Sequence, residues 1–263
     1  MARLTDWIAV GKTVARIAYE SDIRYLATSV SYYAFISFIP LLVLVFAIVG
    51  QQFANEIAAL PARFVTPATR PLIYESLTTA SGRTWAAVLS IVVLAWGGTN
   101  ITVDFLEGVE RIEAATDRPL PRQVRDAAIV LGTVLLAILA VLLQSLLVAV
   151  FADGPLGILL GFGVLLVALT LTFLPLYYVP SRVVTSLSRA LPGALTTAFG
   201  WTVLHAAIQF YTANAAEYAI YGVLSGIILI LTSTYIAAII LMTGVAVNAV
   251  IATEIDDLIM ASA

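Results

Sequence analysis

The stretch from Ala127 to Phe151, AAIVLGTVLLAILAVLLQSLLVAVF, contains no charged side chain. A helix needs about 20 apolar residues to cross the hydrocarbon core of a bilayer, so this stretch is long enough to span it. Backbone groups inside lipid must be hydrogen-bonded within the segment, and a continuous apolar run therefore predicts an α-helix rather than a barrel strand.

The composition of the whole chain agrees with this prediction. Of 263 residues, 61% are hydrophobic and 11% are charged, whereas about a quarter of the residues of a soluble domain are charged. This balance excludes an ordinary water-soluble domain, a disordered chain and a nucleic-acid-binding module. The formal net charge of −3 leaves no basic surface for a polyanion, so we expect no nucleic-acid partner.

Similar apolar stretches recur along the chain, and they predict an all-α polytopic membrane protein that forms one domain over residues 1–263. We expect six transmembrane helices at about 26–51, 85–106, 127–151, 155–179, 191–212 and 222–253. Residues 1–25 predict an amphipathic helix that lies along the membrane surface, with packing against the bundle as the alternative. The connection 53–84 contains three prolines and predicts a short interfacial helix.

The basic residues predict the orientation. Ten of the 13 fall on the side of the two termini, and Arg63, Arg70 and Arg83 fall on the opposite side. Because connections rich in Arg and Lys remain in the cytoplasm, we expect both termini to be cytoplasmic in a multi-pass protein of the cell (plasma or inner) membrane.

Few residues are suited to catalysis. Cysteine is absent and histidine occurs once, which excludes thiolate chemistry and a multi-histidine metal site. No phosphate-binding loop, zinc-protease motif or nucleophile elbow is present. We therefore expect no enzyme, no metal and no cofactor.

The predicted second span carries a polar stripe. Asn100, Asp104, Glu107 and Arg111 follow one another at steps of four, three and four, which places them on one helix face. An ionisable group near lipid is costly and should face the bundle interior or an aqueous cavity. The stripe is interpreted as the wall of a polar pocket, a helix end at headgroup level, or a metal or proton site. If it lines a pocket, Asn100→Leu and Asp104→Leu should impair activity and leave insertion intact.

Two other spans add residues to this pocket. The first span is polar in its cytoplasmic half, where Tyr33 and Ser37 lie, and Pro40 follows as a predicted kink or hinge. Asn248 lies near the cytoplasmic end of the last span, where its amide lines the pocket or bonds a neighbouring helix.

The predicted fifth span carries Trp201, His205 and Gln209 at steps of four. A histidine within a membrane is a candidate proton carrier because its pKa lies near neutrality. His205 and Gln209 therefore predict a proton or polar relay, and a packing role is the alternative.

These residues form part of a pattern that resembles the YihY/BrkB membrane proteins, formerly labelled ribonuclease-BN-like. The resemblance covers roughly residues 15 to 252. It is carried by Ser31-Tyr32-Tyr33-Ala34-Phe35, Phe38-Ile39-Pro40-Leu41-Leu42, Ala190-Leu191-Pro192-Gly193-Ala194 and the segment from Leu241 to Asn248. It implies a six-helix inner-membrane protein, in a family with some members linked to serum resistance or envelope-lipid transport. Val247 precedes Asn248 where the family commonly has a glutamate.

The polar inner half of several spans predicts a function. We expect a transporter or flippase-like protein for a lipid or other amphiphile, with a polar cavity facing the cytoplasm. Membrane lipids and an amphiphilic substrate are the expected partners, and the chain is compatible with a homo-oligomer. The alternative is a non-transporting scaffold for envelope or lipid-synthesis partners, and ribonuclease activity is disfavoured.

Overall fold

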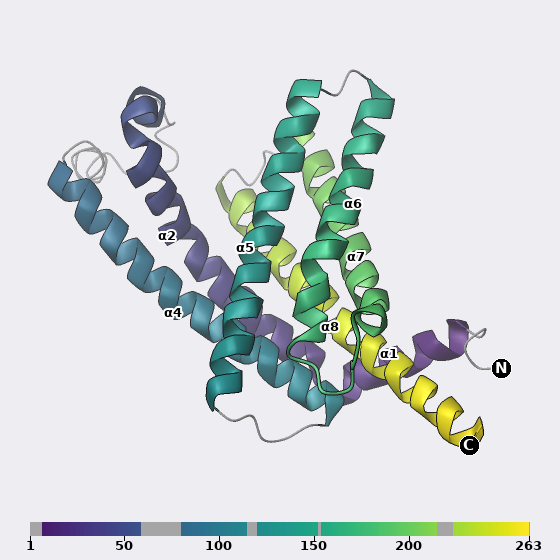
Figure 1. Cartoon of the computed structure of the whole chain (residues 1–263). Helices are drawn as coiled ribbons and strands as arrows, with labels where there is room; N and C mark the ends of the chain where they lie inside the picture. The colour runs from purple at the N-terminus through teal and green to yellow at the C-terminus, as the bar shows by residue number, and fades with distance from the viewer. Residues whose placement is uncertain (1–6, 59–79, 115–119, 152–153, 215–222, 263) are drawn as a thin grey trace.

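The computed structural model describes residues 7–58, 80–114, 120–151, 154–214 and 223–262, and every regular element in these ranges is an α-helix (Figure 1). The helices are α1 (Trp7–Glu20), α2 (Ile23–Ala58), α4 (Ala80–Glu113), α5 (Leu120–Phe151), α6 (Pro155–Tyr178), α7 (Leu187–Ala213) and α8 (Val223–Ser262). The predicted all-α fold is confirmed. The interfacial helix predicted in the connection 53–84 falls mainly on residues outside the described ranges, and the flanks of that connection extend α2 and α4.

Five of the helices are long and apolar enough to cross a membrane. The spans are Ile23–Val45, Thr84–Glu113, Arg122–Leu146, Leu156–Tyr178 and Leu224–Thr253. The predicted span 191–212 is also a helix, α7, but it is not among these five, because polar residues such as Thr197, His205 and Gln209 recur along it. The chain is thus a membrane protein with several apolar helices, and the count of six spans is not confirmed.

Helix α8 holds the bundle together. It contacts α1, α2, α4, α6 and α7, while α7 packs between α6 and α8. Helices α2 and α4 run side by side as an inclined pair, and α5, α6 and α7 stand next to one another beside them (Figure 1). Apolar side chains of α6 repeat on one fully buried face, at Leu165, Leu169, Phe173 and Leu176. These four side chains and Met242 of α8 are among the largest that are fully buried.

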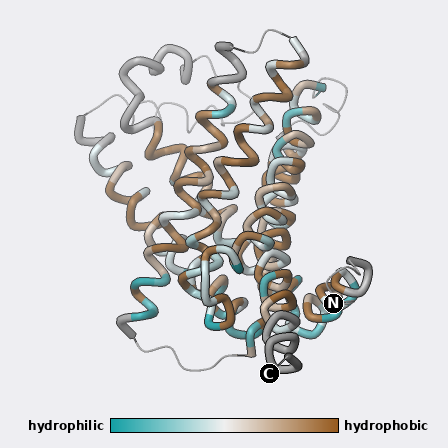
Figure 2. Tube along the Cα trace, turned by 45° about the vertical axis from the view of Figure 1, so that its right-hand side comes forward, coloured by the Kyte–Doolittle hydropathy of each residue, from teal (hydrophilic) through white to brown (hydrophobic). Residues whose placement is uncertain are grey.

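The outer surface of the bundle is apolar as well. On α5, Leu135, Leu139, Leu142 and Leu146 are all more than half exposed, which suits a surface covered by lipid rather than water. Figure 2 shows hydrophobic residues along the middle of most helices, with hydrophilic residues at the lower end of the bundle and others near its upper end. We call the end of the bundle where α4 ends and α5 begins, together with the α6–α7 connection, the charged end.

Helix α1 is amphipathic, as predicted. Val10 and Val14 are buried, whereas Lys12 and Arg16 are exposed. The helix packs against α8 and α2, so the structure agrees with the alternative of packing against the bundle. The prediction that α1 also lies along a membrane surface is not tested by these contacts.

Candidate functional site: a groove between α4 and α5

A groove between α4 and α5 has a volume of about 540 Å³. Sites for small molecules commonly measure about 300–1,000 Å³, so this groove has room for a ligand. It is lined from α4 by Gly98, Thr99, Thr102, Val103, Leu106, Glu107 and Glu110, and from α5 by Gln123, Val124, Ala127, Ala128 and Leu131.

Residue size explains why a groove forms here. At one end the helices touch, because a Cβ on Gly98 would lie only 3.2 Å from the Leu131 Cδ1 atom. Beyond this contact the facing residues of α5 are Ala127 and Ala128, which are too small to fill the space towards α4. The hydroxyls of Thr99 and Thr102 bond carbonyls of their own helix at 2.7 and 2.8 Å, so they present mainly methyl groups to the groove.

The groove is therefore polar at one end and apolar along the rest. Glu107, Glu110 and Gln123 lie towards the charged end, whereas Val103 and Leu131 lie towards the Gly98 contact. Val103 and Val124 are 55% and 71% exposed, so the groove is open along its side. This arrangement suits an amphiphile with a polar head and an apolar tail.

The polar stripe predicted on α4 does not converge on this groove as a unit. Asn100 donates to the carbonyl of Trp96 in its own helix at 2.8 Å. Asp104 accepts a hydrogen bond of 2.6 Å from the Ser29 hydroxyl of α2. Glu107 pairs with Arg111 one turn away, and it alone of the four stripe residues lines the groove.

The predicted residues of the first span pack against α4. The Tyr33 ring meets the Trp96 ring edge-on, with centroids 5.3 Å apart. The buried Ser37 hydroxyl lies where a side chain on Gly97 would be, and it has no hydrogen-bond partner among the described residues. Helix α2 continues without interruption through Pro40, and the hinge remains a prediction.

Asn248 joins α8 to α7. Its side chain is 2% exposed, accepts a 2.7 Å bond from the Gly193 N–H and donates a 3.3 Å bond to the Ala190 carbonyl. Both backbone groups flank Pro192, where the proline ring disturbs the first turns of α7. The Asn248 amide thus replaces helix hydrogen bonding at a proline, which is the interhelical role weighed above.

Asn248 also borders a small hollow of about 10 Å³, which has room for about one water molecule. The hollow is lined by Val109, Glu113, Leu176, Tyr177, Ser181, Val184, Val245 and Asn248. It is too small for an amphiphile and lies apart from the groove.

The predicted pair His205 and Gln209 is brought together, and Gln144 of α5 joins it. The His205 Nε2 atom lies 3.1 Å from Gln144 Oε1 and 2.9 Å from Gln209 Nε2, and the ring contacts Phe162 edge-on. Gln144 is 3% exposed. These contacts link α5, α6 and α7, while the relay itself remains a prediction.

Comparison with known proteins places the chain in a family. A family model described as virulence factor BrkB matches residues 14–261. The chain belongs to the BrkB family. A protein of Bacillus subtilis (strain 168) with the name "Putative ribonuclease-like protein YfkH" is 31% identical over 90 residues, which are 34% of this chain and 33% of that protein. The match therefore covers about a third of that relative's length. No solved structure matches this chain.

The structure explains two of the motifs that carry the BrkB resemblance. The segment Ala190–Ala194 and the segment ending at Asn248 lie far apart in sequence and bond each other in space. Both contain glycines at the contact. A Cβ on Gly193 would lie 2.5 Å from the Asn248 Nδ2 atom, and one on Gly244 would meet the Thr197 hydroxyl of α7 and lie 2.5 Å from the Tyr177 hydroxyl of α6. These motifs of the BrkB-family chain therefore hold α7 closely against α8.

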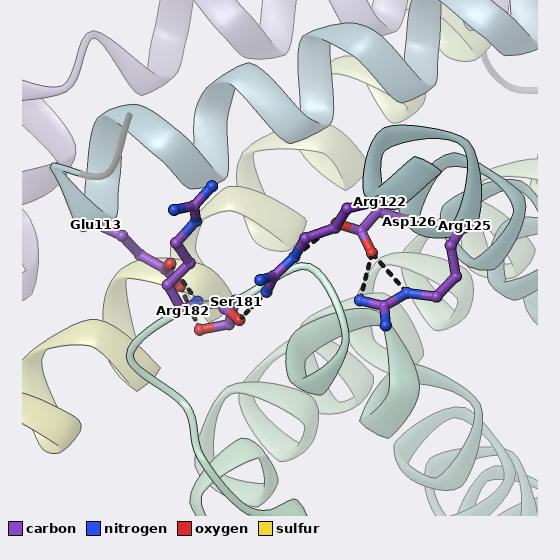
Figure 3. A network of polar contacts seen from close by, with 6 residues as sticks. All are labelled: Glu113, Arg122, Arg125, Asp126, Ser181 and Arg182. Atoms are coloured by element: carbon purple, nitrogen blue, oxygen red, sulfur yellow. Dashed lines mark hydrogen bonds and ion pairs between the residues drawn. The ribbon is translucent and has the colours of Figure 1, made fainter. Parts of the chain in front are cut away.

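The charged end of the BrkB-family chain contains a second polar cluster, which sequence reasoning did not identify as a unit (Figure 3). Glu113 of α4 accepts bonds from the Ser181 hydroxyl and from the Arg182 N–H, the latter at 2.8 Å. These two hydrogen bonds hold the α6–α7 connection against the end of α4.

Arg122 and Arg125 belong to the same cluster. Both bind Asp126, which is fully buried, with the Arg125 Nη2 atom 3.0 Å and the Arg122 Nε atom 3.7 Å from its carboxylate. Arg122 also points towards the Ser181 carbonyl (Figure 3). The spacing of Arg122 and Asp126 by four residues was the available signal for their pairing. Among the described residues, no three acidic, histidine or cysteine side chains are placed to hold a metal ion.

Proposed function

We propose that this BrkB-family protein moves a lipid or other amphiphile across or within the cell membrane by way of the groove between α4 and α5. The observation that carries the proposal is the groove itself, which combines about 540 Å³ of open space with carboxylates and an amide at one end and apolar side chains elsewhere. The head of an amphiphile would meet Glu107 and Glu110, and its tail would lie against Val103 and Leu131.

The location of the groove supports this role. Its polar end lies at the charged end of the bundle, which carries Arg122, Arg125 and Arg182. The excess of basic residues on this side favours a cytoplasmic position for this end and for both termini. The proposed route therefore begins at the cytoplasmic face of the membrane and is open towards the lipid along its side.

The same features disfavour a nuclease. Most of the groove is lined by apolar side chains such as Val103, Val124 and Leu131, which offer few hydrogen bonds to the ribose and phosphates of RNA. We propose that the protein has no ribonuclease activity and needs no metal or cofactor. Cleavage of RNA by the purified protein in the presence of a divalent metal would contradict this.

The test is lipid movement in proteoliposomes. A lipid with a fluorophore on one acyl chain is placed in both leaflets, and a membrane-impermeant reductant bleaches the outer leaflet. The wild-type protein should expose inner-leaflet lipid to the reductant. Ala128→Phe should slow this by about tenfold, because an exposed alanine that lines the groove is replaced by a ring that occupies it. A tenfold slower rate corresponds to about 1.4 kcal/mol in the barrier to lipid movement.

The matched control is Leu139→Phe on the same helix. Leu139 is 58% exposed and does not line the groove, so this ring should leave movement unchanged. If both substitutions slowed lipid movement equally, the groove would not be the route. If the wild-type protein moved no lipid or other amphiphile at all, the alternative of a scaffold that recruits envelope or lipid-synthesis partners would be favoured.

A further inference from the structure

The contact between Gly98 and Leu131 lies near the middle of the apolar span of α4. This span runs from Thr84 to Glu113, so Gly98 is 14 residues from one end and 15 from the other. The residues of α4 that line the groove run from Gly98 to Glu110, which is about 18 Å at a helical rise of about 1.5 Å per residue. The hydrocarbon core of a bilayer is about 30 Å thick. The length of the groove therefore corresponds to about half of the bilayer, on the side of the charged end.

The two helices separate again on the far side of this contact. Ile91 continues the helix face of Gly98 away from the charged end, and Leu135 continues the face of Leu131. Ile91 is 56% exposed and Leu135 is 57% exposed, so these two faces are not packed against each other. Figure 1 shows the reason, because α4 is inclined across α5, and two rods that cross come close only near the crossing. The contact is thus a narrow barrier between the groove and the lipid-exposed faces beyond it.

The packing of the two helices allows this barrier to open. Helix α4 packs mainly against α2, and α5 packs mainly against α6. The barrier itself is a leucine side chain that covers a glycine, since Gly98 is buried and Leu131 is 43% exposed. Apolar side chains gain little from association within a membrane, because lipid tails offer them similar contacts. Separation of α4 from α5 at this point therefore costs little and leaves the main packing of each helix intact.

We infer that the Gly98–Leu131 contact is a gate. When closed, it ends the groove near the middle of the membrane, and it must open before an amphiphile passes to the other leaflet. The inference rests on the proposed function, because the groove is the proposed route, and it identifies the point at which that route is closed. Leu131 is the side chain that closes the gate, and Gly98 is the surface on which it closes.

A cross-link can lock the gate. Because the chain contains no cysteine, Gly98→Cys with Leu131→Cys provides the only two thiols. A Cβ on Gly98 would lie 3.2 Å from the Leu131 Cδ1 atom, so both thiols are within reach of a short bismaleimide, whose bonds the reductant does not cleave. In the proteoliposome assay, the cross-linked protein should move lipid at least about tenfold more slowly than the same variant before cross-linking, an increase of about 1.4 kcal/mol in the barrier.

A matched cross-link joins two helices that the proposed route does not separate. A Cβ on Gly200 of α7 would lie 2.6 Å from the Ile240 Cγ2 atom of α8, so Gly200→Cys with Ile240→Cys accepts the same reagent. Lipid movement by this variant should be unchanged by cross-linking. Leu131→Ala should have the opposite effect to the locked gate and move lipid several-fold faster than the wild type, because a smaller side chain closes the groove less completely.

A distance measurement tests the gate without transport. Spin labels attached at Ile91→Cys and Leu135→Cys report the separation of α4 and α5 from two exposed positions. In lipid nanodiscs, the distribution of distances should contain a shorter and a longer component, which represent the closed and the open gate. Adding Leu131→Ala to the labelled protein should increase the longer component. A single distance that this substitution leaves unchanged would overturn the gate.

The outcomes separate the two proposals. If both distances are present but the wild-type protein moves no lipid or other amphiphile, the opening of the contact stands and the transport proposal fails. If lipid moves and the cross-link between α4 and α5 slows it no more than the cross-link between α7 and α8, transport stands and the gate fails.

Discussion

The polar residues of α7 and of α4 repeat at similar spacings, yet they do different things in the structure. On α7, the Thr197 hydroxyl meets the Tyr177 hydroxyl at 2.5 Å and the Trp201 indole donates to the Ala237 carbonyl at 3.2 Å. One turn further, His205 reaches Gln144. Each of these groups on α7 bonds a different helix.

The stripe on α4 is mostly bonded locally. Asn100 bonds its own helix, Glu107 and Arg111 pair within one turn, and only Asp104 reaches another helix, at Ser29 of α2. Residue spacing therefore indicates which side chains share a helix face, but it does not indicate how far away the next helix lies. Polar groups within α7 hold helices together, whereas α4 keeps carboxylates near open space at the groove.

The largest loss of stability is expected where α8 packs closely against α7 and α6. Gly244→Ala adds a Cβ that meets the hydroxyls of Thr197 and Tyr177, the second at 2.5 Å, so the buried pair must shift. Overpacking of this kind costs about 1–3 kcal/mol, and the loss of the pair's hydrogen bonds places the expected cost near the upper end. The measurement is unfolding in mixed micelles, followed by tryptophan fluorescence.

Gly226→Ala on the same helix is the control. A Cβ there meets nothing within 4 Å, so this variant should unfold within about 0.5 kcal/mol of the wild type, as surface substitutions usually do. If both variants were equally stable, the α7–α8 contact would be looser than described and the contrast between α7 and α4 would weaken.

A smaller loss is expected when the cross-helix amide is removed. Asn248→Leu leaves the Gly193 N–H without its 2.7 Å acceptor beside Pro192. Hydrogen bonds between membrane helices contribute about 0.6–2 kcal/mol, so we expect a loss of about 1–2 kcal/mol in the same unfolding assay.

Thr243→Val is the matched control for this loss. Among the described residues, the Thr243 hydroxyl bonds only the Ile239 carbonyl of its own helix, at 2.8 Å. Its removal should therefore have little effect on stability. A loss as large as that of Asn248→Leu would show that any polar group on α8 matters, whether or not it reaches α7.

The fold could be predicted from the sequence because lipid imposes a simple requirement on length and polarity. The stretch 127–151 lies within α5, and the predicted span 85–106 lies within α4, which continues from Ala80 to Glu113. The predicted span is shorter than helix α4 because both ends of α4 are polar and extend beyond the apolar segment. The family was also predicted correctly from its motifs.

The site was harder to predict, because it depends on which helices separate. Nothing in the stripe from Asn100 to Arg111 shows that α4 diverges from α5 beyond the Gly98–Leu131 contact, or that Glu110 rather than Asn100 faces the resulting groove. The bond from Asn248 to Gly193 crosses 55 residues of sequence. Local periodicity can indicate that Asn248 needs a partner, but it cannot identify the partner.

The smallest effects are expected within α4 itself, where Asp104 and Asn100 can be compared. Asp104→Leu removes the acceptor of the 2.6 Å bond from Ser29 and leaves that hydroxyl unpaired, so we expect a loss of about 1 kcal/mol. Asn100→Leu removes only a bond within its own helix and should stay within about 0.5 kcal/mol of the wild type. Both variants should insert normally in membranes.

Lipid movement in the same two variants then decides between the interpretations of the stripe. Neither Asn100 nor Asp104 lines the groove. If the groove is the route, Asn100→Leu should move lipid at the wild-type rate, and Asp104→Leu should be slower only to the extent that the α2–α4 pair is loosened. Loss of movement in Asn100→Leu without loss of stability would instead favour the predicted pocket along the stripe, because a residue bonded only to its own helix would then be acting on the substrate directly.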